Sequence, residues 1–392
     1  MDLGIGDILT LDIGNIANGG HFVARHDNQI IFVRHAISGE IAKVKITATN
    51  SKFAFGDAVE ILKSSKDRIA PPCKYSHPEG CGGCDFQHIN YGVQLDLKKE
   101  VLKDQFKRIT KIDISPEIIA TNPSNGLHWR SRLNLAISEN KKVGLRAHKS
   151  NAIIEIDECL IALKEINKSD IFTTKWDNVE NLKISCSSTN EINISQFEKS
   201  ILGPDKLTEN VDKNKYTISP KSFWQSHKNA PSLLLQQIIR DSDIKQDEIV
   251  CDLYGGVGLF TLPISKLIGK NGQVHLIEMN DTCIKDANIM FEHIDNIYIH
   301  HGTVEQKLGS VKNIDTIILD PPRNGVSKQV INQMIEKKPN RIVYVSCNPS
   351  TLARDSKILL ENKYSLSNIV GLDLFPMTHH IESVASFKKY NF

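Results

Sequence analysis

Residues 249–258 read Ile-Val-Cys-Asp-Leu-Tyr-Gly-Gly-Val-Gly, and this stretch indicates the fold of the C-terminal part of the chain. An apolar run that carries Asp252 leads into a turn with three glycines, Gly255, Gly256 and Gly258. Glycine has no Cβ, so a glycine-rich turn between a strand and a helix lets backbone N–H groups approach a bound ligand closely. The stretch therefore predicts the nucleotide-like cofactor site of a doubly wound α/β domain.

A second acidic residue follows at the spacing that such a domain needs. Glu278 ends the strand-like run 272–278, twenty residues after Gly258. At that position a carboxylate can accept hydrogen bonds from ribose hydroxyls. The glycine turn and Glu278 fit either a dinucleotide or S-adenosylmethionine, and these residues alone do not distinguish the two.

Strand-like and helix-like segments continue to alternate beyond Glu278. Two more apolar runs end in Asp320, which two prolines follow, and in Cys347. In open α/β sheets, ligands bind outside the carboxyl ends of the strands. Asp252, Glu278, Asp320 and Cys347 all stand at such ends, so we expect them to surround one site.

A cysteine beside a carboxylate suggests nucleophilic catalysis, and a pyrimidine ring is a suitable target. C5 of a pyrimidine is a poor nucleophile until a thiolate adds to C6 and forms an enolate, whose C5 can attack an electrophilic methyl group. A base must then remove the C5 proton so that the cysteine is released. Cys347 fits the nucleophile, and Glu382 fits the base, with His379 and His380 as rivals.

The composition is that of an ordinary globular protein. The chain has 392 residues, which favours two or three domains, and its formal net charge is +2. That charge is too small to imply a polyanionic partner, so a nucleic-acid surface would have to be a local patch. No apolar run reaches the length of a membrane span, and the N-terminus does not resemble a signal peptide. We expect a cytoplasmic monomer without an obligate protein partner.

Residues 1–63 alternate short β-rich runs with turns. Five strands in a segment of this length predict a small closed barrel of the OB type, a fold that often binds nucleic acids. The alternative is a barrel that only packs against its neighbour. The next segment, Ser64–Pro72, is predicted to be a linker. The predicted strands are Leu9–Ile13, His21–Arg25, Gln29–Val33, Glu40–Ile46 and Ala58–Leu62.

Three cysteines then stand within twelve residues, with two glycines between the last two. Such spacing lets the backbone fold around a metal, and cysteines in a reducing compartment are more often ligands than disulfides. Zinc would need a fourth Cys or His ligand, for which His77 or His88 is available. An iron–sulfur cluster would need a fourth thiolate, for which Cys159 is available. The three cysteines are Cys73, Cys81 and Cys84.

Two further segments carry basic residues that could contact RNA. Leu95–Lys111 has a helical pattern with a basic face that could lie along phosphates, although such a face is more often only solvated. His128–Ile137 predicts a strand with Arg130 and Arg132 on one face, because alternate residues of a strand share a face. With Trp129, these arginines would offer phosphate pairing and a stacking surface.

The C-terminal half resembles the RNA uracil-5-methyltransferase family, whose members form 5-methyluridine in tRNA or ribosomal RNA with S-adenosyl-L-methionine. The resemblance implies a class I, Rossmann-like methyltransferase domain. It rests on five motifs in order along the chain: FWQS (223–226), DLYGGVGLF (252–260), LDPPRNG (319–325), YVSCNPSTLARD (344–355) and FPMTHHIESV (375–384).

The resemblance also implies roles for individual residues. Cys347 would be the nucleophile and Glu382 the base that takes the C5 proton. Thr303 would be a further contact of the cofactor. The residues that would surround the methyl donor are Gln225, Tyr254, Glu278 and Asp320.

The N-terminal half resembles the branch of this family that carries a TRAM domain, a small OB-like RNA-binding barrel, and a [4Fe–4S] cluster. This resemblance favours iron–sulfur over zinc and implies Cys73, Cys81, Cys84 and Cys159 as the ligands. The interval between Cys73 and Cys81 is longer than is usual in the branch. The tRNA-specific branch generally lacks barrel and cluster, so ribosomal RNA is the favoured substrate. The alternatives are the same chemistry on a tRNA uridine, or an RNA-binding assembly factor.

We therefore expect an α/β protein of three domains. Residues 1–63 would form the TRAM barrel, and residues 64–215 a central α+β domain with the iron–sulfur cysteines. Residues 216–392 would form the methyltransferase domain, which would modify C5 of a uridine in structured RNA.

Overall fold

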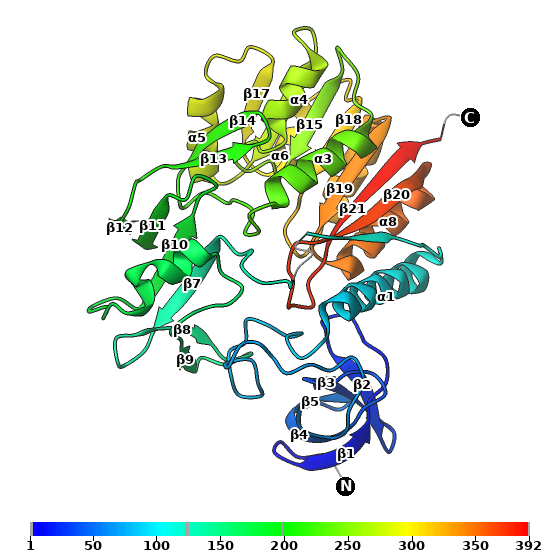
Figure 1. Cartoon of the computed structure of the whole chain (residues 1–392). Helices are drawn as coiled ribbons and strands as arrows, with labels where there is room; N and C mark the ends of the chain where they lie inside the picture. The colour runs from blue at the N-terminus through cyan, green and yellow to red at the C-terminus, as the bar shows by residue number, and fades with distance from the viewer. Residues whose placement is uncertain (1–2, 122–124, 198, 391–392) are drawn as a thin grey trace.

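The computed structural model describes residues 3–121, 125–197 and 199–390 of the chain, and the strands of these residues form four sheets (Figure 1). The largest sheet belongs to the C-terminal part, and a six-stranded sheet and a two-stranded sheet belong to the middle of the chain. The fourth is the five-stranded barrel at the N-terminus. Of the described helices, none is both long and apolar enough to cross a bilayer.

The C-terminal sheet has eight strands in the order β17-β16-β15-β18-β19-β21-β20-β6. The five strands from β17 to β19 are parallel, whereas β21 is antiparallel to both of its neighbours. The strands are β15 (Ile249–Leu253), β16 (Gln273–Glu278), β17 (Ile297–His301), β18 (Thr316–Leu319), β19 (Arg341–Ser346), β20 (Tyr364–Asp373) and β21 (Glu382–Lys389), with β6 (Glu117–Ala120) at one edge.

Helices cover both faces of this sheet, as the apolar runs of its parallel strands require. Along β18, Ile318 belongs to one apolar layer, whereas Ile317 and Leu319 belong to the other, because alternate residues of a strand face opposite sides. Helices α3, α4 and α5 complete the first layer, and α1, α6, α7 and α8 the second. The helices are α1 (Tyr91–Thr110), α3 (Ala230–Ser242), α4 (Thr261–Ile268), α5 (Asp281–Phe291), α6 (Val304–Lys307), α7 (Lys328–Lys337) and α8 (Pro349–Glu361), and a 3-10 turn, η2 (Leu308–Ser310), follows α6.

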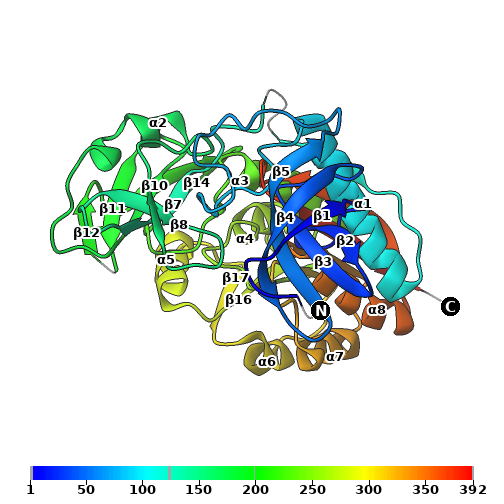
Figure 2. The same ribbon diagram turned by 90° about the horizontal axis from the view of Figure 1, so that it is seen from below.

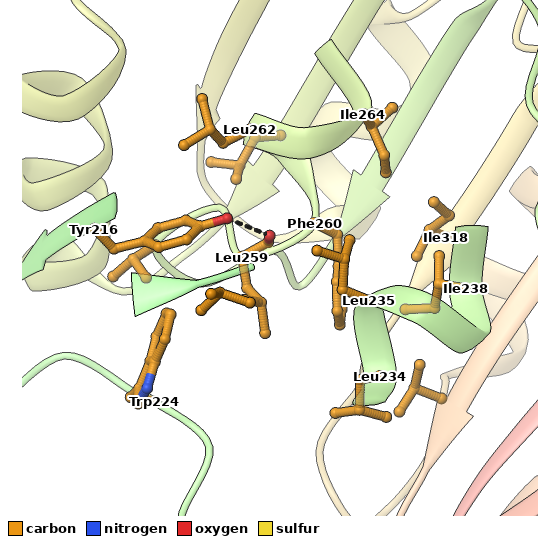
Figure 3. Close-up of a cluster of buried hydrophobic side chains, with 14 of the residues drawn as sticks. Tyr216, Trp224, Leu234, Leu235, Ile238, Leu259, Phe260, Leu262, Ile264 and Ile318 are labelled. Atoms are coloured by element: carbon orange, nitrogen blue, oxygen red, sulfur yellow. Dashed lines mark hydrogen bonds between the residues drawn. The ribbon is translucent and has the colours of Figure 1, made fainter. Parts of the chain in front are cut away.

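Figure 3 shows side chains of the first layer around Leu259 and Phe260, the two residues that follow the glycine turn. Leu234, Leu235 and Ile238 of α3 face Ile318 on the sheet, and all four side chains are buried. The hydroxyl of Tyr216 donates a hydrogen bond of 2.8 Å to the carbonyl oxygen of Leu259, directly after the turn. Tyr216 lies in the two-stranded sheet of β13 (Leu207–Val211) and β14 (Asn214–Ile218), which thereby packs on this layer.

Helix α1 and strand β6 come from the middle of the chain but join the C-terminal sheet. Strand β6 pairs in parallel with β20, and α1 packs against α8. Helix α1 begins at Tyr91 rather than Leu95 because the Asn90 side chain accepts a hydrogen bond from Gly92 N and caps it. The division of the chain at residues 64 and 215 stays a proposal, and these two elements show that contacts cross it.

One residue of the predicted basic face of α1 is not available to phosphates. Lys98 is only 2% exposed and forms a buried ion pair with Asp373 at the end of β20. Its ammonium also donates to the carbonyl oxygen of Phe375 at 3.0 Å. The prediction is therefore wrong for Lys98, whereas Lys107 and Arg108 near the end of the helix are exposed.

The central sheet is antiparallel, in the order β12-β11-β10-β7-β8-β9. The RNA contacts predicted for Trp129 and Arg132 are wrong, because both side chains are buried. Trp129 stacks on His227 with ring centroids 5.5 Å apart, and the guanidinium of Arg132 donates to Ser222 O at 2.9 Å. Both residues thus join the central sheet to the segment before α3. The elements are β7 (Arg132–Ile137), β8 (Val143–Arg146), β9 (Ile153–Glu155), α2 (Lys164–Lys168), η1 (Asp170–Phe172), β10 (Asn181–Cys186), β11 (Ile192–Gln196) and β12 (Lys199–Leu202).

The N-terminal barrel has the strand order β1-β4-β5-β3-β2 and its own apolar core. All five predicted strands are present, and β5 begins at Phe53, five residues before the predicted start. The segment that follows is not a loose linker, because Arg68 forms an ion pair of 2.7 Å with buried Glu40. Figure 2 shows the barrel beside α1. Its strands are β1 (Ile8–Asp12), β2 (Phe22–His26), β3 (Gln29–Arg34), β4 (Ile41–Thr49) and β5 (Phe53–Lys63).

Candidate active site

The carboxyl ends of the parallel strands gather the residues that the sequence singled out. The sheet order reverses between β15 and β18, so a crevice for ligands is expected there. Asp252 lies at the end of β15 and Glu278 ends β16. Asp320 directly follows β18, and Cys347 directly follows β19.

The register between β19 and β21 brings Cys347 next to Glu382. Ser346, the last residue of β19, pairs with Ser383 in this antiparallel ladder, so the position that follows β19 continues the register opposite the residue before Ser383. That position is Cys347, and the residue opposite it is Glu382, the first residue of β21. A thiol and a carboxyl group far apart in sequence thus meet at one end of the sheet.

Glu382 is a buried carboxyl group with spare hydrogen-bonding capacity. Glu382 is only 4% exposed, and its Oε1 atom has no hydrogen-bond partner among the described residues. Burial raises the pKa of Glu382 well above its usual range, the charge of Asp320 raises it further, and Arg323 opposes both. A carboxylate with a raised pKa is a stronger base than an exposed one.

Cys347 lies in a small pocket whose surroundings favour the neutral thiol. Burial raises the pKa of Cys347 to about 11, the nearby charges of Glu382 and Asp320 also raise it, and Arg323 lowers it. Arg323 had no role in the sequence-based prediction, although it lies in the motif that begins at Leu319. In this arrangement Arg323 is the described cation whose charge favours the reactive thiolate.

The N-terminal barrel contributes to this same pocket. The pocket has a volume of about 150 Å³, and Asn18 and Gly19 line it together with Cys347. Gly20 has a φ of +76°, and a Cβ at this position would lie 2.3 Å from the Cβ of His379. The barrel loop therefore touches the segment before Glu382, a contact that no local sequence pattern indicated.

The two histidines that competed with Glu382 have other surroundings. His379 Nδ1 lies 2.6 Å from the Asp85 carboxylate, which engages this ring nitrogen. Burial lowers the pKa of His380 to about 3, and the charges of His379 and Arg323 lower it as well. A ring with so low a pKa is a weak base near neutral pH, so Glu382 remains the better candidate.

A larger cavity of about 710 Å³ lies beside the glycine turn. Tyr254, Glu278 and Thr303, which we expected from the sequence to surround the cofactor, line it. Glu278 Oε2 accepts a hydrogen bond of 3.0 Å from Gly256 N, which fixes the carboxylate beside the turn. Gly258 has a φ of +88°, and a Cβ there would lie 2.5 Å from the Phe291 ring, so the turn requires glycine. The size and the carboxylate of this cavity fit an adenosine-containing cofactor.

Gln225 and Asp320 are placed differently from the other predicted cofactor contacts. Neither is among the described residues that line the larger cavity. Gln225 Nε2 donates to Asp320 Oδ2 at 3.1 Å, and burial, followed by the charge of Asp252, raises the pKa of Asp320 to about 7. Because Asp320 also acts on the pKa of Cys347 and Glu382, Gln225 and Asp320 lie on the side of these two residues.

The four predicted cluster cysteines are close enough to interact electrostatically. Burial raises the pKa of each thiol, and that of Cys81 reaches about 11. The charge of Cys159 acts on Cys81 and Cys84, and that of Cys73 acts on Cys81 and Cys159. Within the described parts of the chain, no three His, Cys, Asp or Glu side chains converge closely enough to hold a single metal ion.

The histidines that could have completed a zinc site are engaged elsewhere. A ring nitrogen of His77 lies 2.7 Å from Pro78 O. His88 is buried, and its Nε2 lies 3.1 Å from the carbonyl oxygen of Ala36 in the barrel. These contacts give no support to zinc coordination by either histidine.

Comparison with known families identifies the protein's relatives. The profile described as tRNA (uracil-5-)-methyltransferase matches residues 169–390, more than half of the chain. A TRAM domain profile matches residues 4–59, which cover most of the barrel. The chain belongs to the RNA uracil-5-methyltransferase family. As a member of this family it is an S-adenosylmethionine-dependent enzyme that modifies RNA.

Relatives match the chain over nearly its whole length. The 23S rRNA (uracil(1939)-C(5))-methyltransferase RlmD of Photorhabdus laumondii is 30% identical, and the match covers 97% of each chain. An uncharacterized RNA methyltransferase of Streptomyces avermitilis is also 30% identical, with 97% of this chain and 98% of the relative covered. These two relatives therefore match the N-terminal barrel and the middle of the chain as well as its C-terminal part.

A solved structure supports the same fold. The tRNA (uracil-54, C5)-methyltransferase of Pyrococcus abyssi, determined with S-adenosyl-L-homocysteine, superimposes with a TM-score of 0.74. The two chains are 24% identical, and the superposition covers 96% of this chain and 99% of the other. The Rossmann-like methyltransferase domain expected from residues 249–258 is thus confirmed.

Proposed function

We propose that this enzyme methylates C5 of a uridine in large-subunit ribosomal RNA through a covalent bond between Cys347 and C6 of the base. The observation that carries the proposal is the β19–β21 register, which puts the buried Glu382 carboxyl group opposite Cys347. A nucleophile and a base at adjacent positions are what addition to C6 and proton removal from C5 require.

Cys347 performs the first step of the proposed reaction. Its thiolate adds to C6, and the electron pair of the C5–C6 double bond moves toward O4, so that C5 becomes nucleophilic. The thiol must lose its proton for this step, and the positive charge of Arg323 lowers the pKa of Cys347 in that direction. When S-adenosylmethionine is bound in the cavity of Tyr254 and Glu278, it supplies an electrophilic methyl group for C5.

Glu382 performs the last step. Its carboxylate takes the proton from C5, the C5–C6 double bond forms again, and the bond between Sγ and C6 breaks. The products are the 5-methylated base and a free Cys347 thiolate. The Oε1 atom of Glu382, which has no hydrogen-bond partner among the described residues, and the raised pKa of Glu382 support this role, because a buried carboxylate is stabilised by accepting a proton.

The choice of ribosomal RNA rests on similarity over the whole chain. The 23S rRNA enzyme of Photorhabdus laumondii matches 97% of this chain. A tRNA uridine is the second candidate, because the fold is also that of the Pyrococcus abyssi tRNA enzyme. For either RNA, the target base must leave its stack to reach Cys347, which lies in a pocket of about 150 Å³.

A methyl-transfer assay tests the proposal. Purified protein with labelled S-adenosylmethionine is given unmodified 23S rRNA and, separately, unmodified tRNA, and the digested nucleosides are analysed. We expect 5-methyluridine from 23S rRNA only. 5-Methyluridine from tRNA alone would transfer the proposal to tRNA. No product from either RNA, with intact cofactor binding, would contradict it and favour the assembly-factor alternative.

We further propose that Cys73, Cys81, Cys84 and Cys159 hold a [4Fe–4S] cluster. The donor set has the required chemistry, because Cys73, Cys81 and Cys84 lie within twelve residues and their thiols, like that of Cys159, are free. The charge of Cys159 also acts on the pKa of Cys81 and Cys84. Gly83 N also donates to Cys81 Sγ at 3.4 Å, a kind of contact that stabilises thiolate ligands. When bound, the cluster would join the Cys73–Cys84 segment to Cys159 as a structural crosslink.

Metal analysis of protein purified without oxygen tests this assignment. We expect about four iron atoms and four sulfides per chain. Cys159→Ser should lose most of the iron, whereas Cys186→Ser is the matched control, since Cys186 is a buried cysteine in the same apolar cluster as Cys159. Stoichiometric zinc in place of iron, or iron retained in Cys159→Ser, would overturn it.

A further inference from the structure

A second cavity, which the proposed reaction does not use, lies between the barrel and the central sheet. Its volume is about 450 Å³, within the range of about 300–1,000 Å³ that is usual for small-ligand sites. One wall comes from His21, Arg34 and Phe55 of the barrel, and the opposite wall from the turn 147–152 between β8 and β9. We call it the barrel cavity.

The barrel cavity lies next to the catalytic pocket along one barrel loop. Gly19 lines the catalytic pocket, and His21, two residues later, lines the barrel cavity. The charge of His379, at the catalytic pocket, also acts on His21. A strand of RNA with its target uridine at Cys347 would therefore pass the mouth of the barrel cavity with a nearby nucleotide.

Two aromatic side chains of the barrel, His21 and Phe55, line this cavity, and Phe32 and Phe53 lie next to them. The ring of Phe55 lies 5.3 Å from His21 and 5.5 Å from both Phe32 and Phe53, measured between centroids. All four side chains are only half-buried, whereas Ala54, between two of them, is fully buried in the barrel core. The alternation along β5 thus directs a group of aromatic rings outward, where an unpaired base can stack on them.

The charged groups of the cavity complement a nucleotide. Lys149 is exposed at the tip of the opposite turn, and its Nζ lies 4.5 Å from the centroid of the Phe55 ring. Two carboxylates also line the cavity: Asp57 is paired with Arg34 at 3.2 Å, and Glu79 is paired with Lys45 at 2.9 Å. A carboxylate repels a phosphate but accepts hydrogen bonds from the amino or imino groups of a base. A base therefore fits inside, and its phosphate fits at Lys149.

We propose that the barrel cavity binds an unpaired base of the RNA substrate near the target uridine, stacked on Phe55 with its phosphate at Lys149. This inference rests on the proposed RNA substrate and adds a specific recognition site to it. Because the two walls belong to different parts of the chain, the site also explains why the barrel and the turn 147–152 face each other across a space that side chains do not fill.

Binding of short RNA to the full-length protein tests the inference. The probes are fluorescently labelled single-stranded pentamers of A, C, G and U, measured by anisotropy at several salt concentrations. Phe55→Leu removes the aromatic face but keeps an apolar side chain, and should weaken the best-bound pentamer by roughly tenfold. Lys149→Ala should reduce the salt dependence by about one phosphate contact.

Two controls make the result interpretable. Lys213→Ala changes another exposed lysine in a hairpin turn, between β13 and β14, and should bind the pentamers like the wild type. Affinity for S-adenosyl-L-homocysteine and the thermal unfolding temperature should stay unchanged in Lys149→Ala, whose side chain is exposed, even if Phe55→Leu weakens the barrel.

The outcomes separate this inference from the proposed function. Wild-type affinity for all pentamers in both Phe55→Leu and Lys149→Ala would overturn the barrel cavity as a base site, whatever the methyl-transfer assay gives. Weakened pentamer binding without any 5-methyluridine from the wild-type enzyme would support the cavity and contradict the proposed reaction.

Discussion

His379 Nδ1 lies 2.6 Å from Asp85 Oδ2. This contact joins the segment 73–85, which we call the cysteine segment, to the loop that precedes Glu382. Asp85 directly follows Cys84, and His379 comes three residues before Glu382. Backbone hydrogen bonds reinforce the contact, because Asp85 N and Phe86 N both donate to Met377 O, at 3.1 and 3.0 Å. The loop that presents Glu382 is thus held by the segment that carries three of the four proposed cluster ligands.

We predict that Asp85→Ala lowers kcat for RNA methylation by about tenfold or more while the KM for S-adenosylmethionine stays near its wild-type value. The reason is that a displaced loop moves Glu382 relative to the base, and small displacements at a reacting centre cost large factors in rate. Steady-state kinetics with both substrates, together with iron content, checks it.

The matched control for Asp85 is Asp157→Ala. Asp157 also forms an ion pair with the cysteine segment, at 2.6 Å from Lys74, and accepts a hydrogen bond of 2.8 Å from Tyr75 of that segment rather than from the loop before Glu382. If Asp157→Ala lowers kcat as much as Asp85→Ala, the effect belongs to the cysteine segment as a whole and not to the contact with His379.

We predict different failures for Cys347→Ala and Glu382→Gln. Cys347→Ala should lose turnover by at least about a thousandfold, with cofactor affinity retained, because it removes the nucleophile. Glu382→Gln should accumulate a covalent RNA–protein adduct, visible on a denaturing gel, because release of Cys347 needs the base. Cys283→Ala, a change at a buried thiol in α5, serves as the control. Turnover by Cys347→Ala would refute the nucleophile assignment.

We predict that Gly20→Val impairs RNA methylation without impairing cofactor binding. A Cβ at Gly20 would lie 2.3 Å from His379, so the side chain would push the barrel away from the catalytic pocket. Gly39→Val is the control, since Gly39 also has a positive φ, +84°, but nothing lies within 4 Å of its Cβ position. Both variants bear similar backbone strain, so only the contact differs. Equal kcat/KM for the two variants would contradict the prediction.

We predict that Lys98→Met lowers the free energy of unfolding by about 3–5 kcal/mol, because it leaves the Asp373 carboxylate buried without its cation. Tyr91 still donates to Asp373 Oδ2 at 2.9 Å, so the loss is not the full cost of an isolated charge. Lys107→Met removes the exposed ion pair between Lys107, on the same helix, and Asp113, and should lower the free energy of unfolding by less than about 1 kcal/mol. Denaturant unfolding of both variants measures the difference, and equal losses would show that the buried pair has no special role.

We predict a pH dependence of stability from Asp252. Burial raises the pKa of Asp252 to about 7, although Thr261 Oγ1 donates to its Oδ2 at 2.6 Å. Between its unfolded value near pH 4 and pH 7, the folded state binds more protons than the unfolded state, so this group lowers the free energy of unfolding as pH rises. Asp252→Asn should remove that decline, by up to a few kcal/mol at pH 8.

Denaturant unfolding at pH 5 and pH 8 checks the Asp252 prediction. Asp286 provides a control of opposite sign. Burial raises the pKa of Asp286, but hydrogen bonds from Lys206, Ser222 and Ser219 lower it, and its pKa is lowered overall. Its stabilisation is therefore present above pH 4 and lost as pH falls below that value. An Asp252→Asn variant whose stability falls between pH 5 and pH 8 as steeply as the wild type would rule out this role.

Local patterns predicted the individual elements well. The five barrel strands and the glycine turn after β15 follow from alternation and turn residues, which act over a few neighbouring positions. The predictions for Trp129, Arg132 and Lys98 failed because burial of a polar or aromatic residue depends on distant partners. These partners are His227, Ser222 and Asp373, and no pattern around the three residues reveals them.

The sequence by itself determined the candidates for the chemistry, since a thiol, a carboxyl group and a glycine turn are properties of single positions and short motifs. Only the tertiary structure decided that Cys347 and Glu382 face each other, because strand β21 inserts antiparallel between β19 and β20. It also decided that Gly20 touches His379 and that the barrel completes the catalytic pocket. Such contacts depend on how whole elements pack together to bury apolar surface, and local periodicity does not encode that packing.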